Sequence, residues 1–254
     1  AAPALYATLQ SDPCQSALDM AQDLTDLGET ALAAEILGGL PQPCAMTAYV
    51  RGFLTGDTAV WMQAGKLPIG IAYPLRPLEY QALTAAIAAN PQDAAALNLL
   101  GCLMYHMENY ERAAALWEQA VEADSAQYMA YRNLAAAYYS HLGRPEKALP
   151  LLEKALALHP GDGQLVWEKG YLMTRLHAAP LDTAALLAAS GIMREDVTLE
   201  RCRALNLAGQ HAQVLELMAS RQFVPCEGGE HAVAEQYMFA HHALGRKAMQ
   251  AGDL

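Results

Sequence analysis

The chain has 254 residues and a formal net charge of −11 at neutral pH. That charge opposes binding to nucleic acid, because phosphate backbones need Lys and Arg to displace their counterions. No charge-free apolar run reaches the roughly 18 residues of a membrane-spanning helix. The composition is 54% hydrophobic but only 7% aromatic, with long alanine-rich tracts, which is typical of closely packed helices.

The five cysteines are odd in number, scattered along the chain, and never spaced as a C-x-x-C pair. Such spacing predicts neither a disulfide framework nor a zinc site. A reducing, cytoplasmic location therefore fits best, and we expect neither a metal nor a cofactor. The cysteines are Cys14, Cys44, Cys102, Cys202 and Cys226.

The N-terminal part predicts helical hairpins around a proline-rich interruption. Residues 14–41 carry two apolar stripes at helical spacing on either side of Gly28. Residues 45–91 are less regular, because a helix over 45–54 and a second piece ending near 66 are followed by three prolines within 67–77. Proline does not fit a regular helix interior, so we predict an ordered loop here that packs onto the helices. A helix over 78–89 follows.

The centre of the chain contains two successive copies of one pattern, over residues 94–127 and 128–162. Each copy is a helix–turn–helix of about 34 residues, with small residues where the helices cross and large apolar residues between them. Asp93 is the predicted N-cap of the first copy. The matching positions are Leu97, Leu100, Gly101, Met104, Ala113, Trp117 and Ala120 in the first copy, and Leu134, Ala135, Tyr138, Ala148, Leu152, Ala155 and Pro160 in the second.

This pattern resembles the tetratricopeptide repeat, which implies an all-α fold. We expect a right-handed α–α superhelix with an irregular proline-rich insertion, formed by residues 1–254 as a single solenoid. Divergent hairpins over 164–190 and 195–220 continue it, and an incomplete repeat over 231–254 ends it. The last helix would then lack a partner on one face.

In tetratricopeptide arrays the first helix of each repeat lines the concave groove, and the resemblance places six side chains there. They would suit an acidic or carboxylate-ended peptide. The Lys/Asn/Arg clamp of chaperone-binding repeats is not reproduced, so that cargo is not expected. The groove residues are Asn98, Tyr105, His106, Arg132, Asn133 and Tyr139.

Short motifs outside the central repeats carry a second resemblance. They are Tyr-Pro-Leu-Arg at 73–76, Arg-Asn-Leu-Ala at 132–135, Met-Arg-Glu-Asp at 193–196 before Glu200, Leu-Asn-Leu-Ala-Gly at 205–209, and the segment 223–230. The chain resembles the C-terminal repeat region of a bacterial family of unassigned function. In that family a β-rich domain similar to galactose mutarotases precedes the array. The chain begins with Ala1, and we expect it to be part of a larger protein.

The last of these motifs contains Glu227, Gly228, Gly229 and Glu230. In the family it usually reads Phe-His-Pro-Trp-Glu-Gly-Gly-Glu-Gly, and Val224, Cys226 and His231 depart from that pattern. Adjacent glycines permit positive φ and close approach of a ligand, while the glutamates would accept hydrogen bonds from sugar hydroxyls or hold a cation. A tight turn with Glu230 at a helix N-terminus explains the same residues. Both interpretations stay open.

The sequence contains no complete catalytic motif. Gly65-Lys66 is not a phosphate-binding loop, because Val60 stands where that motif needs glycine and Leu67 where it needs Ser or Thr. Ser190-Gly191 lacks the preceding glycine of a nucleophile elbow. We therefore predict a non-catalytic interaction or scaffold module that binds a protein, a peptide or its own missing β-domain. The alternative is an accessory domain of a carbohydrate-active, mutarotase-like enzyme. A third hypothesis is homo-oligomerisation through the uncovered last helix.

Overall fold

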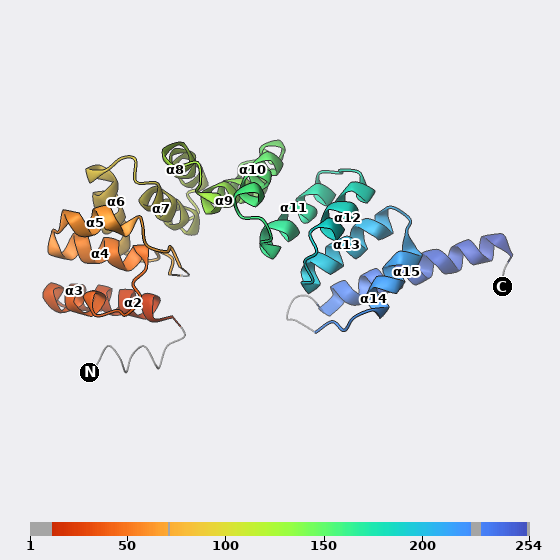
Figure 1. The fold of residues 1–254 in the computed structure, drawn as a ribbon, viewed down its shortest axis with the longest axis horizontal. Helices are drawn as coiled ribbons and strands as arrows, with labels where there is room; N and C mark the ends of the chain where they lie inside the picture. The colour runs from red at the N-terminus through yellow and green to blue at the C-terminus, as the bar shows by residue number, and fades with distance from the viewer. Residues whose placement is uncertain (1–11, 71, 225–229, 253–254) are drawn as a thin grey trace. The chain divides into compact units, whose positions relative to one another are not determined.

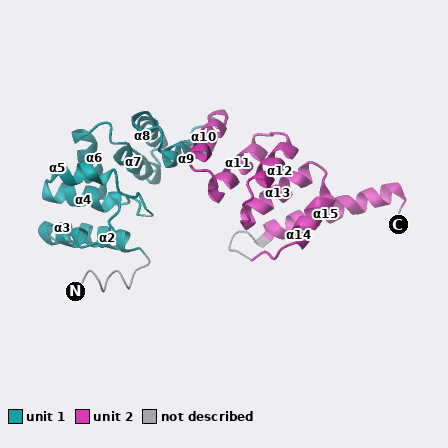
Figure 2. Cartoon of the chain, in the orientation of Figure 1, with its two compact units in different colours: residues 1–144 teal, residues 145–254 magenta. Residues whose placement is uncertain are grey.

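The computed structural model describes residues 12–70, 72–224 and 230–252, which fold into fourteen helices without a strand (Figure 1). The predicted all-α fold is therefore confirmed. The chain divides into two compact units, residues 1–144 and 145–254 (Figure 2). The single-solenoid organisation stays a prediction, and each unit is described by itself. Within the described residues, no helix has both the length and the hydrophobicity needed to cross a bilayer.

Unit 1 consists of helical hairpins joined by short turns. α2 packs on α3, α4 on α5 and α7 on α8, while α6 packs between α4 and α7. Short connections favour antiparallel neighbours, which is why consecutive helices pair. The helices are α2 (Pro13–Asp26), α3 (Thr30–Gly38), α4 (Ala45–Thr55), α5 (Thr58–Ala64), α6 (Pro77–Ala89), α7 (Ala94–His106), α8 (Tyr110–Ala123) and α9 (Tyr128–Ser140).

Aspartate side chains start several of these helices. Asp93 Oδ1 accepts from the Ala96 backbone N–H at 3.1 Å, so the predicted N-cap of α7 is confirmed. Asp12 and Asp57 cap α2 and α5 in the same way. Each cap satisfies an otherwise unpaired N–H group and typically stabilises a helix by about 1 kcal/mol.

Glycine and tryptophan fix the crossing of two hairpins in unit 1. A Cβ atom on Gly101 would lie 2.5 Å from Trp117 Nε1, and that nitrogen donates to the Asn98 carbonyl oxygen at 3.1 Å. α4 and α5 repeat the arrangement, with Gly52 beneath Trp61. Both tryptophans therefore pack between helices, and the close approach is possible because glycine lacks a side chain.

The proline-rich segment 67–76 contains no helix within its described residues and packs on unit 1, as expected. The Ala45 backbone N–H donates to the Pro68 carbonyl oxygen at 2.9 Å, which anchors the segment to the start of α4. Ala72 is 1% exposed. Arg76 N–H donates to Glu79 Oε2 at 2.8 Å, so the segment ends at the cap of α6.

In unit 2 the first helices of three successive hairpins, α11, α13 and α15, pack side by side. α11 contacts α13, and α13 contacts α15, while α12 and α14 pack behind them. A core cluster around Cys202, Leu205, Val214 and Ala240 joins α13, α14 and α15. The helices are α10 (Pro145–Leu158), α11 (Gly163–Arg175), α12 (Pro180–Ala189), α13 (Glu195–Leu207), α14 (His211–Ala219) and α15 (Glu230–Ala251).

Candidate functional site

The predicted groove of unit 1 is formed by α7 and α9, and its centre is largely buried. Asn98 is 1% exposed, and its Oδ1 atom has no hydrogen-bond partner among the described residues. One turn further along α7, Cys102 Sγ accepts from Asn133 Nδ2 at 3.5 Å. The structure therefore joins Asn133 to α7, while Asn98 lies beneath the surface and presents nothing to solvent.

Tyr73, from the proline-rich segment, lies against the same two helices. Burial raises the pKa of the Tyr73 phenol, the Cys102 thiol adds to the rise, and the Arg132 guanidinium opposes it. Tyr73 remains 37% exposed. The chain's own loop thus contributes a side chain to the face that the sequence assigned to a partner.

The other predicted groove residues separate from this centre. Tyr105 packs in an aromatic cluster, with ring centroids 5.1 Å from Tyr110, 5.7 Å from Trp117 and 5.3 Å from His141. His106 is exposed at the end of α7, and Tyr139 is half-buried on α9. The six residues do not therefore form one continuous polar surface.

The other predicted site is the Glu-Gly-Gly-Glu motif. Glu227, Gly228 and Gly229 lie outside the described residues. Glu230 begins α15, but its side chain also lies outside them. The two interpretations of this motif remain predictions.

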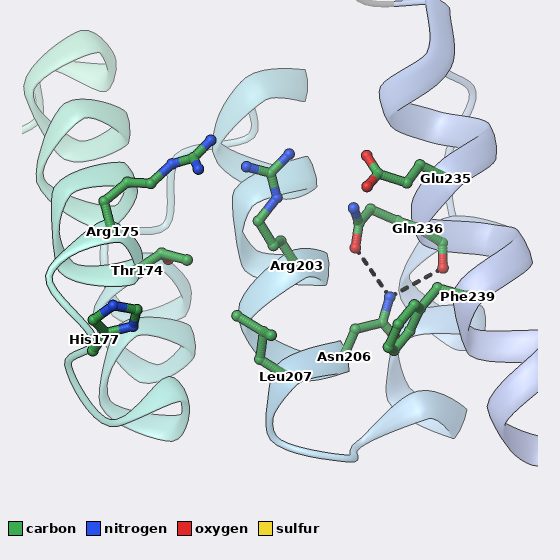
Figure 3. A pocket seen from close by; sticks show the side chains of 9 residues that line it. All are labelled: Thr174, Arg175, His177, Arg203, Asn206, Leu207, Glu235, Gln236 and Phe239. Atoms are coloured by element: carbon green, nitrogen blue, oxygen red, sulfur yellow. Dashed lines mark hydrogen bonds between the residues drawn. The ribbon is translucent and has the colours of Figure 1, made fainter.

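A groove of about 740 Å³ lies in unit 2, across the faces of α11, α13 and α15 (Figure 3). α13 packs between the other two helices, and residues of all three helices line the groove. The lining residues are Thr174, Arg175, His177, Arg203, Asn206, Leu207, Glu235, Gln236 and Phe239.

Buried amides form the floor of this groove. Asn206 Nδ2 donates to the Gln236 backbone carbonyl at 3.0 Å and to Gln236 Oε1 at 3.1 Å. On its other side, Asn206 Oδ1 lies 3.1 Å from His211 Nδ1. Asn206 and Gln236 are each 5% exposed, so these bonds hold α13 against α14 and α15 where water is excluded.

A buried carboxylate lies between α11 and α13. Glu200 is 4% exposed, and its Oε1 atom accepts from the Thr174 hydroxyl at 2.6 Å. Its Oε2 atom lies 3.6 Å from Arg203 Nη1. Arg203 therefore offsets the buried negative charge while its guanidinium still lines the groove.

The rim carries exposed charges of both signs. Arg175 is exposed, with its guanidinium carbon 5.0 Å from the centre of the Tyr171 ring. Figure 3 shows the guanidinium groups of Arg175 and Arg203 toward one end of the groove, with Glu235 across from them. Of the ion pairs formed by described residues, none involves Arg175 or Glu235.

This arrangement offers hydrogen-bonding and apolar groups to a ligand. The guanidinium groups would donate to a carboxylate, Glu235 would accept from a donor, and Phe239, 52% exposed, offers an apolar ring. Among the described residues, no group of three or more His, Cys, Asp or Glu side chains is placed to hold a metal. The groove thus presents a fixed floor and a charged rim.

The residues of this groove were not predicted from the sequence, although signals were present. Asn206 and Glu200 both belong to motifs that carried the family resemblance. Arg175 and Arg203 each lie near the end of a first helix in successive hairpins. Their equivalent positions on successive helices and their shared charge could have indicated a common site for Arg175 and Arg203.

Residues 107–161 match the family model of the tetratricopeptide repeat. The match is confined to this central segment of the chain. The match spans α8, α9 and α10, so it covers nearly all of the second predicted copy and the second helix of the first, but not α7. The predicted repeat type is therefore confirmed, whereas the β-domain-containing family is a separate, unconfirmed resemblance.

Solved structures similar to this chain include YrrB, PilF and MamA. YrrB, described as a TPR protein with an unusual peptide-binding site, is 23% identical with a TM-score of 0.53; the match covers 68% of this chain and 85% of YrrB. Pseudomonas aeruginosa PilF is 17% identical with a TM-score of 0.49, covering 81% and 88%. MamA is 16% identical with a TM-score of 0.41, covering 76% and 96%. The likeness to YrrB shows the fold of the tetratricopeptide solenoid.

Proposed function

We propose that this protein is a non-catalytic interaction module that binds a protein or peptide segment in the groove of unit 2. The observation that carries the proposal is the exposed Arg175, which forms no ion pair with another described residue, above a floor of buried amides. A preformed floor lowers the ordering cost of binding, and an accessible cation supplies selectivity. YrrB, a similar fold, is described as having a peptide-binding site.

The preferred ligand is a segment with at least one carboxylate and an apolar side chain. A carboxylate would pair with Arg175 and Arg203, and the apolar group would contact Phe239 and Leu207. A neighbouring donor would face Glu235. The preferred ligand resembles the acidic peptide predicted from the sequence. The residues proposed to bind it lie in unit 2, however, whereas the sequence prediction named residues of unit 1.

A peptide array tests this proposal with the full chain. Labelled protein is applied to 12-residue synthetic peptides whose acidic and aromatic content varies independently. We expect capture by peptides that carry Asp or Glu beside an apolar residue, and Arg175→Ala should weaken capture about tenfold, as expected for one lost charge-assisted hydrogen bond. Arg246→Ala, an exposed arginine on α15 outside the groove, is the matched control. Equal binding by all three proteins would remove the groove from the function.

The six groove residues of unit 1 remain a second proposed contact surface. Arg132, Asn133, His106 and Tyr139 retain some exposure, whereas a partner reaching Asn98 would have to displace covering groups. Arg132→Ala in the same array would reduce capture if this face also binds. An unchanged profile would restrict binding to unit 2.

The larger context is proposed from the resemblance alone. On that basis the chain belongs to a larger bacterial protein and contacts a β-rich, mutarotase-like domain, or serves as accessory domain of a carbohydrate-active enzyme. Replacing Glu227 and Glu230 with Gln in the full-length gene product, followed by a sugar-binding assay, tests the alternative. Unchanged sugar handling would dismiss a role for the motif.

Self-association through α15 is a further proposal. Met238 and Met249 are each 66% exposed and Tyr237 is 48% exposed, an unusual apolar content for a surface helix. Sedimentation of wild type and Met238→Glu over a wide concentration range is the test. A monomer throughout for the wild type would dismiss it.

A further inference from the structure

Two cysteines from different hairpins meet in unit 1. Cys14 lies in the first turn of α2, and Cys44 is the residue immediately before α4. All of α3 separates them in sequence, yet α2 and α4 contact one another. Cys14 is half-buried and Cys44 is 5% exposed. Both are free thiols in this structure.

Both cysteines line one cavity of about 370 Å³. Its walls include Pro41, Pro43 and Pro68, whose rings fix the backbone around the two thiols. The Cys44 backbone N–H donates to Thr47 Oγ1 at 3.1 Å, which holds this residue in place. The cavity gives a small reagent a route to the half-buried Cys14 in an otherwise rigid setting.

The Cys14 thiol reaches the backbone beside Cys44. Cys14 Sγ donates to the carbonyl oxygen of Gln42, two residues before Cys44, at 3.4 Å. Burial raises the pKa of Cys14 to about 12, and the charge of Cys44 and a side-chain hydrogen bond with it add to the rise. Cys102 and Cys202 have no comparable thiol neighbour among the described residues.

We propose that Cys14 and Cys44 are a thiol pair that closes to an intramolecular disulfide by exchange with a small-molecule or protein disulfide. The bond would join the start of α2 to the start of α4 and enclose α3. It would fix the hairpin of α2 and α3 covalently against α4. In the reduced chain, noncovalent packing holds this hairpin against α4.

The exchange balances in two steps. The Cys14 thiolate attacks one sulfur of the disulfide reagent, whose S–S bond breaks and releases a thiolate. The Cys44 thiolate then attacks the Cys14 sulfur of the mixed disulfide and releases the second reagent thiolate. Two protein thiols are oxidised, one reagent disulfide is reduced to two thiols, and the two protons pass to the released thiolates.

Mapping of the wild-type full chain tests the proposal without any variant. The protein is equilibrated in mixtures of reduced and oxidised glutathione, quenched in acid, alkylated with N-ethylmaleimide, digested and analysed by mass spectrometry. We expect a peptide pair joined through Cys14 and Cys44 in the oxidising mixtures, and alkylated Cys102 and Cys202. Alkylated Cys14 and Cys44 in excess oxidised glutathione would overturn the proposal.

Two variants separate closure from simple modification. Cys44→Ser should trap Cys14 as a glutathione adduct, while Cys102→Ser should leave the joined peptide pair unchanged. Because the Cys14 thiolate fraction grows tenfold per pH unit below its raised pKa, closure should accelerate about tenfold from pH 7 to pH 8. A stable glutathione adduct on wild-type Cys14, without the joined pair, would contradict the proposal.

Discussion

Units 1 and 2 each present a surface formed by the first helices of successive hairpins. These helices are α7 and α9 in unit 1, and α11, α13 and α15 in unit 2. The two surfaces differ in what their polar side chains contact. In unit 1 the proline-rich segment brings Tyr73 against the face, and Asn98 is buried beneath it. In unit 2 the buried amides bond to one another, and the charges stay at the rim. The same hairpin architecture therefore buries the centre of one face and leaves an open groove in the other.

Both surfaces require hairpins whose two helices pack closely, and in unit 1 glycine allows this close packing where the helices cross. Gly101→Ala would place a methyl group 2.5 Å from Trp117 Nε1, so the Trp117 ring or the two helices must shift. We expect a loss of about 2–3 kcal/mol in the free energy of unfolding, because overpacking outweighs the gain in helix propensity. Urea unfolding followed by tryptophan fluorescence measures it.

Gly245→Ala is the matched control for that experiment. Gly245 is also helical, but a Cβ atom added there would meet no other atom within 4 Å. This substitution should stabilise the chain by up to about 1 kcal/mol, as is usual for alanine in an exposed helix. Equal effects of the two substitutions would show that the crossing at Gly101 is not tightly packed.

The second test concerns the floor of the open groove. Asn206→Ala removes the donor to Gln236 and the partner of His211, which leaves buried polar atoms unpaired. We expect a loss of about 1–3 kcal/mol in the stability of unit 2. Gln213→Ala, which removes an exposed amide on α14, should change stability by less than about 0.5 kcal/mol. Hydrogen exchange of α13 and α15 follows the effect locally.

The third and smallest test concerns the covered face of unit 1. We expect Tyr73→Ala to expose Cys102, whose pKa is raised to about 12 by burial. Greater solvent access lowers that pKa and increases the thiolate fraction, so labelling of Cys102 by maleimide should become several-fold faster. Cys202 in unit 2 is the internal control. An unchanged labelling rate for Cys102 would mean that Tyr73 does not cover it.

The helices could be predicted because their signals are local. Hydrophobic spacing and turn residues located α13 at 195–207, and the small-to-large pairing of Gly101 with Trp117 indicated how α7 crosses α8. These features repeat within about 34 residues, so one copy supports the interpretation of the next.

The sites were harder to predict because their contacts join distant segments. Periodicity assigns Asn98 to the inner face of a first helix, but it does not distinguish a buried position from an exposed one. The Asn206–Gln236 bond and the Cys14–Cys44 pair each depend on the packing of separate hairpins. Neither pairing leaves a pattern in the intervening sequence.

Photocrosslinking from the groove tests the central claim most directly. A benzophenone amino acid replaces Leu207, which is 58% exposed in the groove, or Leu181, which is 55% exposed on α12 and outside it. Each protein is irradiated with the acidic peptides that the array selects. The account predicts crosslinks from position 207 that excess unlabelled peptide abolishes, and none from position 181. Equal crosslinking from both positions, or crosslinks from position 181 alone, would contradict it.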